Sequence, residues 1–167
     1  MSSGKTRSIP RSILARCCTF SRTLAQLQLP GGCLSGHLEK FFFIASFCLV
    51  SARYNKSIGQ VHEAPFLHAR AQHIMQEIEA IARAKGIALP ADLIERTFDK
   101  AATFPYQTPT SLQLDVHAGK DRTELDLFAG AILTYGEALG LPVPETQAIY
   151  QEIQTLVTTG QPESAAL

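Results

Sequence analysis

Three polar side chains stand where they could do acid–base or binding chemistry: Lys40, Ser111 and Glu124. Lys40 opens the most hydrophobic stretch of the chain, and apolar surroundings disfavour a charged ammonium, so this lysine could donate a proton near neutral pH. Ser111 follows a loop with two prolines and begins a predicted helix, where backbone N–H groups could hold a carboxylate. Glu124 begins another predicted helix and could pair with a catalytic lysine or a ligand hydroxyl.

Each of these residues also has an ordinary structural interpretation. A lysine at this position can extend its ammonium into water along its apolar stem. The serine can cap the N-terminus of its helix, and the glutamate is an acid that the helix dipole favours there. Taken one at a time, the three residues therefore do not name a reaction.

The chain lacks the sequence patterns of other common sites. Its cluster of glycines, Gly31, Gly32 and Gly36, does not have the G-x-G-x-x-G spacing of a dinucleotide-binding turn, and no predicted strand precedes it. The sequence has no P-loop and no G-x-S-x-G nucleophile elbow. Three histidines are close in sequence, but their spacing does not bring them to one helix face, so we expect surface histidines and no metal site. These histidines are His62, His68 and His73.

From about Leu38 onward, the chain is predicted to form one helix after another. Apolar residues recur at three- and four-residue steps, and no stretch alternates with period two for long enough to predict a strand. Gly86 and Gly140 are placed to end two of the helices. The predicted helices are Leu38–Tyr54, Pro65–Lys85, Pro90 to about Thr103, Ser111–His117, Thr123–Leu139 and one that begins at Pro144. These segments predict an all-α protein, a helical bundle.

The 167-residue chain has no net charge, but its charges are unevenly distributed. Residues 1–60 hold eight basic side chains and one acid, a net charge of +7, whereas residues 61–167 hold seven and fourteen, a net charge of −7. Residues 1–36 contain no acid and are rich in Ser and Arg, which is typical of an organelle transit peptide and equally of a truncated or wrongly joined start. We expect a basic, poorly ordered leader over residues 1–36, a helical domain over 37–157 and a flexible tail over 158–167.

Composition excludes several classes of protein. A hydrophobic content of 46% with 18% charged residues excludes a wholly disordered chain, and no stretch reaches the ~18 apolar residues of a membrane span. Zero net charge gives no electrostatic reason for a nucleic-acid partner. The four cysteines lack zinc-site spacing and favour a reducing compartment, so we expect the cytoplasm, or the mitochondrion if residues 1–36 are a transit peptide. These cysteines are Cys17, Cys18, Cys33 and Cys48.

Several segments join the three polar residues into one pattern. They are Leu38–Phe47, with Gly59 nineteen residues after Lys40, then Glu77–Ile87, Thr110–Asp115, Gly119, Thr123–Asp126 and Gly140–Pro144. In this order, over about residues 37–155, they resemble the C-terminal domain of the ketopantoate reductase (2-dehydropantoate 2-reductase) family. That domain is a helical bundle of the 6-phosphogluconate dehydrogenase C-terminal type, and it normally follows an NADP-binding Rossmann domain, which has no counterpart in this sequence.

The resemblance implies a role for each of the three residues. The lysine matching Lys40 donates a proton to the carbonyl oxygen of a 2-keto acid while NADPH delivers hydride to the carbonyl carbon, as in pantothenate biosynthesis. The serine matching Ser111 binds the substrate, and the glutamate matching Glu124 contacts the cofactor and helps to orient the lysine. The implied partners are a small 2-keto acid and either a Rossmann-domain partner or a second copy of the chain.

The sequence departs from the family pattern at positions where the family has asparagines. These positions are Ile44, Cys48, Ile58 and Thr108. Each lost amide hydrogen bond would weaken the binding of polar ketopantoate by ~1 kcal/mol or more, which favours a more apolar keto acid. The departures and the missing cofactor domain leave a second hypothesis open, namely a non-catalytic helical dimerisation module or a pseudoenzyme remnant.

Overall fold

The computed structural model describes residues 34–120 and 123–159. Residues 1–33 of the predicted leader, with three of the cysteines, and residues 160–167 of the predicted tail lie outside the described residues. Regular structure in the described part is entirely helical, which confirms the predicted all-α fold. The elements are α2 (Leu34–Tyr54), α3 (Ile58–Glu63), α4 (Pro65–Ala84), α5 (Leu93–Ala102), α6 (Ser111–His117), the π-helical turn η2 (Asp126–Gly130), α7 (Ala131–Leu139) and α8 (Pro144–Thr159).

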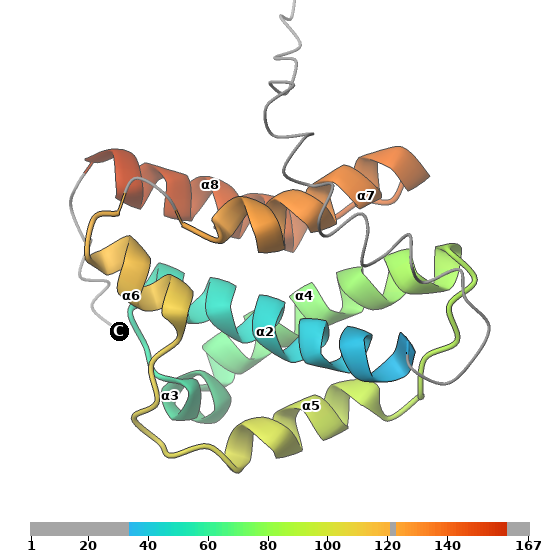
Figure 1. Ribbon diagram of the computed structural model, residues 1–167, viewed down its shortest axis with the longest axis horizontal. Helices are drawn as coiled ribbons and strands as arrows, with labels where there is room; N and C mark the ends of the chain where they lie inside the picture. Colours follow the sequence, from blue (N-terminus) through green and yellow to red (C-terminus); the bar gives the residue numbers. More distant parts are fainter. Residues whose placement is uncertain (1–33, 121–122, 160–167) are drawn as a thin grey trace, which may run out of the picture. The chain divides into compact units, whose positions relative to one another are not determined.

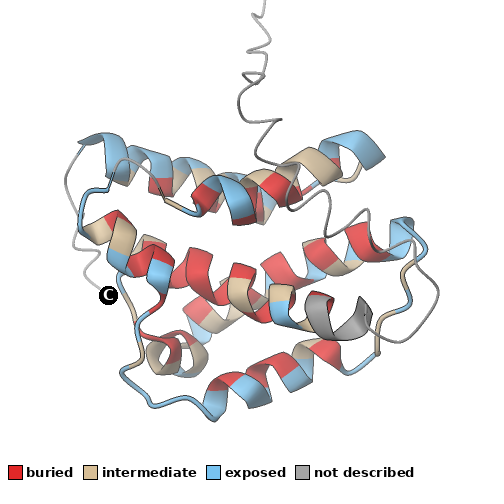
Figure 2. Ribbon diagram, in the orientation of Figure 1, coloured by how far each residue is buried: buried red, intermediate tan, exposed pale blue. Residues whose placement is uncertain are grey.

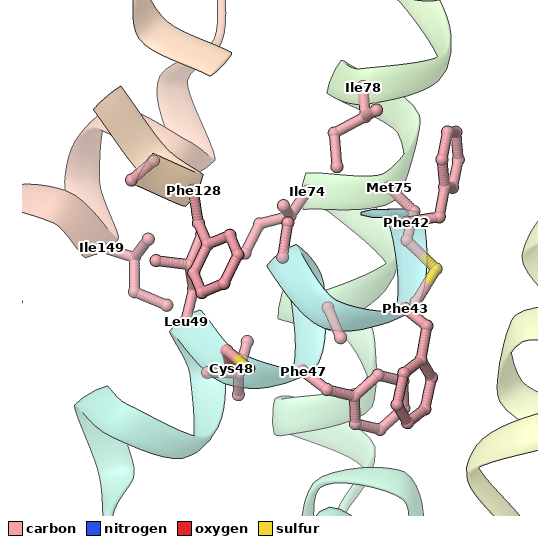
Figure 3. Packing of buried hydrophobic residues seen from close by; sticks show 14 of the residues in the cluster. Phe42, Phe43, Phe47, Cys48, Leu49, Ile74, Met75, Ile78, Phe128 and Ile149 are labelled. Carbon is pink, nitrogen blue, oxygen red and sulfur yellow. The ribbon is translucent and has the colours of Figure 1, made fainter. Parts of the chain in front are cut away.

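Helix α2 packs against α4, α5, α6 and α8, so it is the central helix of the bundle (Figure 1). Its sequence is apolar on almost every side, and it is buried along most of its length (Figure 2). Phe42, Phe47 and Leu49 are fully buried and belong to one hydrophobic cluster with Ile74 of α4 and Ile149 of α8 (Figure 3). Since each such side chain contributes about 1.5–3 kcal/mol on burial, α2 provides much of the stability of the bundle.

Helix α4 confirms the amphipathic pattern in the sequence. Its buried residues are Leu67, Ala71, Ile74, Met75, Ile78, Ile81 and Ala82, the positions that recur at helical spacing. Pro65 is its first residue, where the missing N–H of proline costs nothing. Gly86 follows its end with a φ of 73°, the left-handed conformation that glycine adopts without strain.

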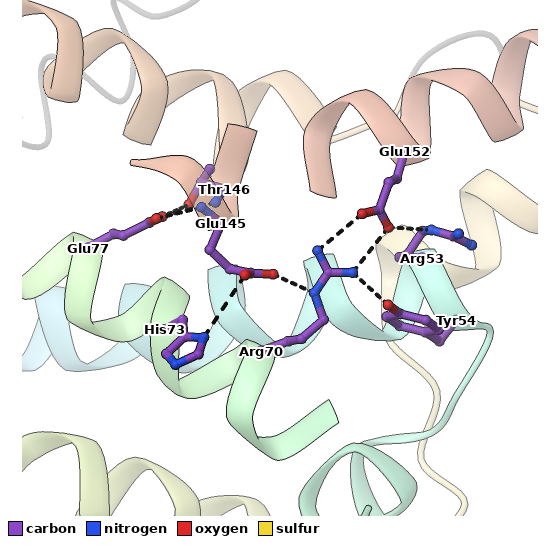
Figure 4. Close-up of polar contacts among 8 residues, drawn as sticks. All are labelled: Arg53, Tyr54, Arg70, His73, Glu77, Glu145, Thr146 and Glu152. Atoms are coloured by element: carbon purple, nitrogen blue, oxygen red, sulfur yellow. Dashed lines mark hydrogen bonds and ion pairs between the residues drawn. The ribbon is translucent and has the colours of Figure 1, made fainter. Parts of the chain in front are cut away.

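The N-terminus of α8 is capped by a side chain from another helix. One carboxylate oxygen of Glu77 in α4 accepts a hydrogen bond from the amide of Glu145 at 2.7 Å. The other oxygen accepts from the amide and the hydroxyl of Thr146, at 3.0 and 2.6 Å (Figure 4). An acid at this position satisfies unpaired amides and complements the helix dipole, so Glu77 fixes where α8 begins.

An ion-pair network then holds α8 against α2 and α4. The guanidinium of Arg70 pairs with both Glu145 and Glu152 and donates a hydrogen bond to the hydroxyl of Tyr54 at 2.6 Å (Figure 4). Arg53 binds the same Glu152 at 2.5 Å. Burial disfavours the charged form of Glu152, but the hydrogen bonds from the two arginines outweigh burial and lower the pKa of Glu152. Losing Arg70 would therefore leave the partly buried carboxylate of Glu145 without its arginine partner and Glu152 with Arg53 alone.

Two local features differ from the prediction. A single helix was expected over 123–139, but the structure has the π turn η2 running directly into α7. The short helix α3 was not predicted, although Ser57 and Gln60 form a capping box at its start, a pattern visible in the sequence. Within residues 34–120 and 123–159, no helix is both long and apolar enough to cross a membrane.

Candidate functional site

Three residues on α2 form what we call the Lys40 face: Lys40, Ile44 and Cys48. They are four residues apart and therefore share one side of the helix. Lys40 is exposed, Ile44 is half-buried and Cys48 is buried, so the face runs from solvent into the bundle. At the exposed end, the ring of Phe41 lies 6.5 Å from the ring of Phe128 in η2. The exposed end of the Lys40 face therefore lies close to the turn that follows Glu124.

Ser111 and Glu124 are brought together by a direct hydrogen bond. The hydroxyl of Ser111 donates to the carboxylate of Glu124 at 3.1 Å, and both residues are exposed. The backbone carbonyl of Glu124 accepts hydrogen bonds from the amides of Leu127 and Phe128, so Glu124 stands at the start of the π turn. The hydroxyl of Thr123, one residue before Glu124, accepts from the amide of Leu125 at 3.4 Å. Two segments that meet only in the folded chain thus share one polar contact.

The simplest structural interpretation of Ser111, that it caps α6, is wrong. The cap is Thr110, whose hydroxyl accepts from the amide of Gln113 at 3.3 Å while the Gln113 side chain accepts from the amide of Thr110. Ser111 is the first residue of the helix. Because the neighbouring threonine does the capping, the hydroxyl of Ser111 is available to bind Glu124.

Cys48 connects the Lys40 face to this polar contact. Burial, and to a smaller extent the negative charge of Glu124, raise the pKa of its thiol from 9.0 to about 12, and hydrogen bonds from Thr110 and Leu112 act in the opposite direction. The thiol is therefore neutral at physiological pH and lies within electrostatic reach of Glu124. Cys48 consequently lies where α2, the start of α6 and the 123–130 segment come together.

Lys40 is the one residue of the three that no side chain holds. Among the described residues, it forms no hydrogen bond or ion pair. It lies eight residues before Cys48, which is about 12 Å along the helix axis. The structure thus joins Ser111 to Glu124 and leaves the ammonium of Lys40 free, on the helix face that their segments border.

The loop that leads into Ser111 is fixed by α3. The amide of Ile58 donates to the carbonyl of Thr108 at 2.9 Å, and the amide of Gly59 donates to the carbonyl of Tyr106 at 3.1 Å. The hydroxyl of Tyr106 also donates to Glu63 at 2.6 Å. A Cβ atom on Gly59 would lie only 2.5–2.8 Å from Tyr106, including its backbone. Only glycine allows this approach, which explains the glycine at this position in physical terms.

Residues 34–157 match the family model described as Ketopantoate reductase PanE/ApbA C terminal. The chain belongs to the ketopantoate reductase family. It represents the C-terminal helical domain of that family, as the resemblance in the sequence implied.

Individual relatives agree with this assignment. A 2-dehydropantoate 2-reductase of Pyrobaculum aerophilum is 28% identical over 110 residues, which are 66% of this chain and 39% of the relative. The crystal structure of a PanE/ApbA family ketopantoate reductase from Ralstonia eutropha JMP134 is 26% identical, with a TM-score of 0.69 over 78% of this chain and 43% of that chain. A dimeric ketopantoate reductase from Staphylococcus aureus, 15% identical, shares the fold with a TM-score of 0.69 over 86% of this chain and 52% of that chain. The present chain spans about two fifths of the length of the curated relative.

The four positions where the ketopantoate reductase pattern has asparagines differ in how deeply they are buried. Cys48 and Ile58 are buried, with 6% and 4% of their surface exposed, and they are part of the hydrophobic core. Ile44 and Thr108 keep partial exposure, and the hydroxyl of Thr108 is already bonded to the carbonyl of Pro105 at 2.7 Å. Ile44 therefore presents an apolar side chain at the surface, one turn beyond Lys40.

The three histidines expected at the surface occupy two environments. His73 is exposed and its ring nitrogen lies 4.0 Å from Glu145. His62 and His68 are half-buried instead, with rings 5.8 Å apart, and the ring of His68 stacks on Phe98 at 3.7 Å. Within the part of the chain that the structure describes, no three His, Cys, Asp or Glu residues are grouped so as to hold a metal ion.

Two residues beside the site were missed by the sequence analysis. Thr110 caps α6 and contacts Cys48, and Asp126 in η2 accepts a hydrogen bond from the hydroxyl of Tyr150 at 2.6 Å. The spacing of Thr110 and Gln113 is a capping-box pattern that could have revealed the first. No sequence signal links Asp126 with Tyr150, because the two are 24 residues apart and belong to different helices.

Proposed function

We propose that the chain is the substrate-side domain of an NADPH-dependent reductase that converts a 2-keto acid into a 2-hydroxy acid. The observation that carries this proposal is the hydrogen bond between Ser111 and Glu124 beside the Lys40 face. Ser111 and Glu124 are 13 residues apart and Lys40 lies far from both in the sequence, yet α6 and η2, which begin at or just after these two residues, both pack against α2, which carries Lys40. Such convergence is expected of a site and is not required for packing.

Lys40 is the proposed general acid. NADPH, when bound, supplies the hydride that reduces the carbonyl carbon of the substrate. The ammonium of Lys40 donates a proton to the carbonyl oxygen and stabilises the negative charge that develops there. Its exposure and its lack of an ion-pair partner among the described residues leave it free to approach an anionic substrate.

Ser111 and Glu124 are the proposed binding residues for substrate and cofactor. The hydroxyl of Ser111 can turn from Glu124 to a substrate carboxylate, since a hydroxyl both donates and accepts. Glu124 is an exposed acceptor, which fits contact with hydroxyl or amide donors of NADP. The described residues do not fit the cofactor's pyrophosphate, because the sequence has no glycine-rich turn of the required spacing. A Rossmann domain must therefore supply that part of the site, and we propose it as a partner, with a second copy of the chain as the other candidate.

The proposed substrate is a 2-keto acid with a more apolar substituent than that of ketopantoate. Ile44 offers a half-buried aliphatic side chain next to Lys40, whereas Cys48, the next position of this face, is buried in the core. Neither side chain can replace the donors and acceptors of an amide, so a polar substituent would lose its hydrogen-bond partners on binding. An apolar substituent would instead gain from burial against Ile44.

A non-catalytic helical module is the second candidate. The observation that favours it is the burial of Cys48 and Ile58, which puts core packing where the family has ligand-binding amides. The two candidates differ in cofactor binding, so NADPH can be titrated into the full chain with its fluorescence as the readout. Tight binding would count against the non-catalytic module.

The decisive experiment follows NADPH oxidation with a series of 2-keto acids, using the chain joined to the NADP-binding domain of the Ralstonia eutropha relative. Replacing Lys40 by alanine should lower kcat by about 100-fold or more, the usual contribution of a general acid. Lys100→Ala is the matched control, because Lys100 is an exposed lysine near the ring of Phe43 on another side of α2. Normal turnover by the Lys40→Ala variant would refute the proposed function.

A further inference from the structure

The π turn η2 closely follows Glu124 in the chain, so its stability bears on the position of Glu124. A π turn has i→i+5 hydrogen bonds, is rarer than an α-helical turn and is often found at functional sites. Here it begins two residues after Glu124 and carries Phe128, whose ring faces Phe41 next to Lys40. The position of Glu124 relative to Ser111 therefore depends on how firmly this turn is held.

A single hydrogen bond connects the turn to α8. The hydroxyl of Tyr150 donates to Asp126, the first residue of η2, at 2.6 Å. Burial raises the pKa of Tyr150, and so do the hydrogen bond and the negative charge of Asp126. The hydroxyl thus keeps its proton and stays a donor at physiological pH.

Helix α8 is itself a fixed point in the bundle. At 100° per residue, Tyr150 lies on one edge of the buried face of α8, and Glu145 with Glu152 lies on the other, with Ile149 and Ile153 between them. The glutamates are bound by arginines of α2 and α4, and the apolar residues are in the core. Tyr150 therefore extends from a helix that is anchored independently of the site.

We propose that Tyr150 is a positioning residue, which holds Glu124 against Ser111 by binding Asp126 in the π turn. The effect of Tyr150 on catalysis rests on the proposed function, in which Lys40 is the general acid and Glu124 helps to orient it. The effect of Tyr150 on the contact between Ser111 and Glu124 does not depend on that function. We predict that this contact weakens when the hydroxyl of Tyr150 is removed, even though the two residues are on different elements from Tyr150.

The test uses NMR spectra of the full 167-residue chain. The carboxyl ¹³C shift of Glu124 is measured, and the Ser111→Ala variant defines its value when the contact is absent. Tyr150→Phe should move this shift at least half of the way to the Ser111→Ala value. Asp126→Ala should do the same, whereas Asp126→Asn, which keeps an acceptor oxygen for Tyr150, should stay at the wild-type value.

Tyr54→Phe is the matched control. This substitution also removes a tyrosine hydroxyl that is hydrogen-bonded to a charged group, in this case the guanidinium of Arg70. Tyr54 is on α2, however, and Arg70 binds the edge of α8 that carries Glu145 and Glu152. A Glu124 signal that stays at its wild-type position in both Tyr150→Phe and Asp126→Ala, or that moves equally in Tyr54→Phe, overturns the proposal. If Tyr150→Phe fails to fold by circular dichroism, the pair Asp126→Ala and Asp126→Asn decides the question. No cofactor or substrate is present in these spectra, so an inactive enzyme in the turnover assay would refute the proposed function without touching this result.

Discussion

Replacing Gly59 by alanine should destabilise the protein, although alanine is the better helix former. The added Cβ atom would lie 2.5 Å from the ring atom Cδ2 of Tyr106, 2.6 Å from its carbonyl oxygen and 2.8 Å from its Cα. Real Cβ contacts are essentially never this short, so the neighbour must move. The ring can turn away, but the carbonyl oxygen and the Cα belong to the backbone of the loop that leads into Ser111. The substitution therefore forces this loop away from α3.

The size of the effect follows from three terms. Overpacking of this kind costs about 1–3 kcal/mol. The hydrogen bond from the amide of Gly59 to Tyr106, now 3.1 Å long, is stretched or lost, at about 0.5–1.5 kcal/mol. Alanine recovers up to about 1 kcal/mol through its helix propensity. The free energy of unfolding should consequently fall by about 0.5–4.5 kcal/mol.

Urea unfolding followed by circular dichroism measures this loss as a lower midpoint. Gly130→Ala is the matched control, because a Cβ there would meet Asp126 at 3.5 Å, an ordinary contact, and should leave stability unchanged or slightly higher. Trimming the ring with Tyr106→Ala should not rescue Gly59→Ala, since the shortest unavoidable contacts are with backbone. A Gly59→Ala variant as stable as Gly130→Ala, or one rescued by Tyr106→Ala, would refute the reasoning.

Two further predictions concern the stability of the bundle. Glu77→Ala should lower the free energy of unfolding by about 1–3 kcal/mol, because it leaves the amides of Glu145 and Thr146 uncapped. Glu79→Ala on the same helix is the control, since it loses only an ion pair with exposed Arg83. In the same urea assay, this control should cost about 0.5 kcal/mol or less. The thiol of Cys48 has a pKa of about 12 in the folded state against 9.0 in the unfolded chain, so the unfolded state loses this proton first. The free energy of unfolding should therefore fall as pH rises from 9 toward 12, by about 1.4 kcal/mol per pH unit. Urea midpoints of the wild type should therefore fall more steeply over this range than those of Cys48→Ala, and equal slopes would contradict the buried, protonated thiol.

The bundle could be predicted from the sequence because its longest helices have unambiguous patterns. Helix α4 shows seven apolar positions at helical spacing, and α2 is apolar on nearly every side, so burial and element type follow from periodicity alone. The grouping of Lys40, Ser111 and Glu124 as candidate site residues came from the family pattern, and the structure joins only Ser111 and Glu124 directly. The helix cap was misassigned because two adjacent hydroxyl residues, Thr110 and Ser111, stand at the start of α6, although the capping-box spacing of Thr110 and Gln113 in the sequence indicates Thr110.

The π turn could not be predicted for a related reason. A π turn and an α-helical turn share the same residues and differ by one position in hydrogen-bond register, so propensity hardly separates them. Contacts from outside the turn can decide between the two. In this chain, Tyr150 binds Asp126 from α8, and Phe41 lies against Phe128 from α2. Neither contact can be read from residues 123–130 alone, which explains why the register of the turn was not predicted from the sequence.

The departures from the family pattern do not bear equally on specificity. Cys48 and Ile58 are buried members of the hydrophobic core, so these residues serve packing. Thr108 already uses its hydroxyl to bind Pro105 within the loop. Ile44, in contrast, is half-buried at the surface one turn from Lys40, so under the proposed function it is the position that can contact the substrate. The proposed preference for an apolar substituent therefore depends chiefly on Ile44, and the changes at Cys48 and Ile58 are better understood as adaptations of the core.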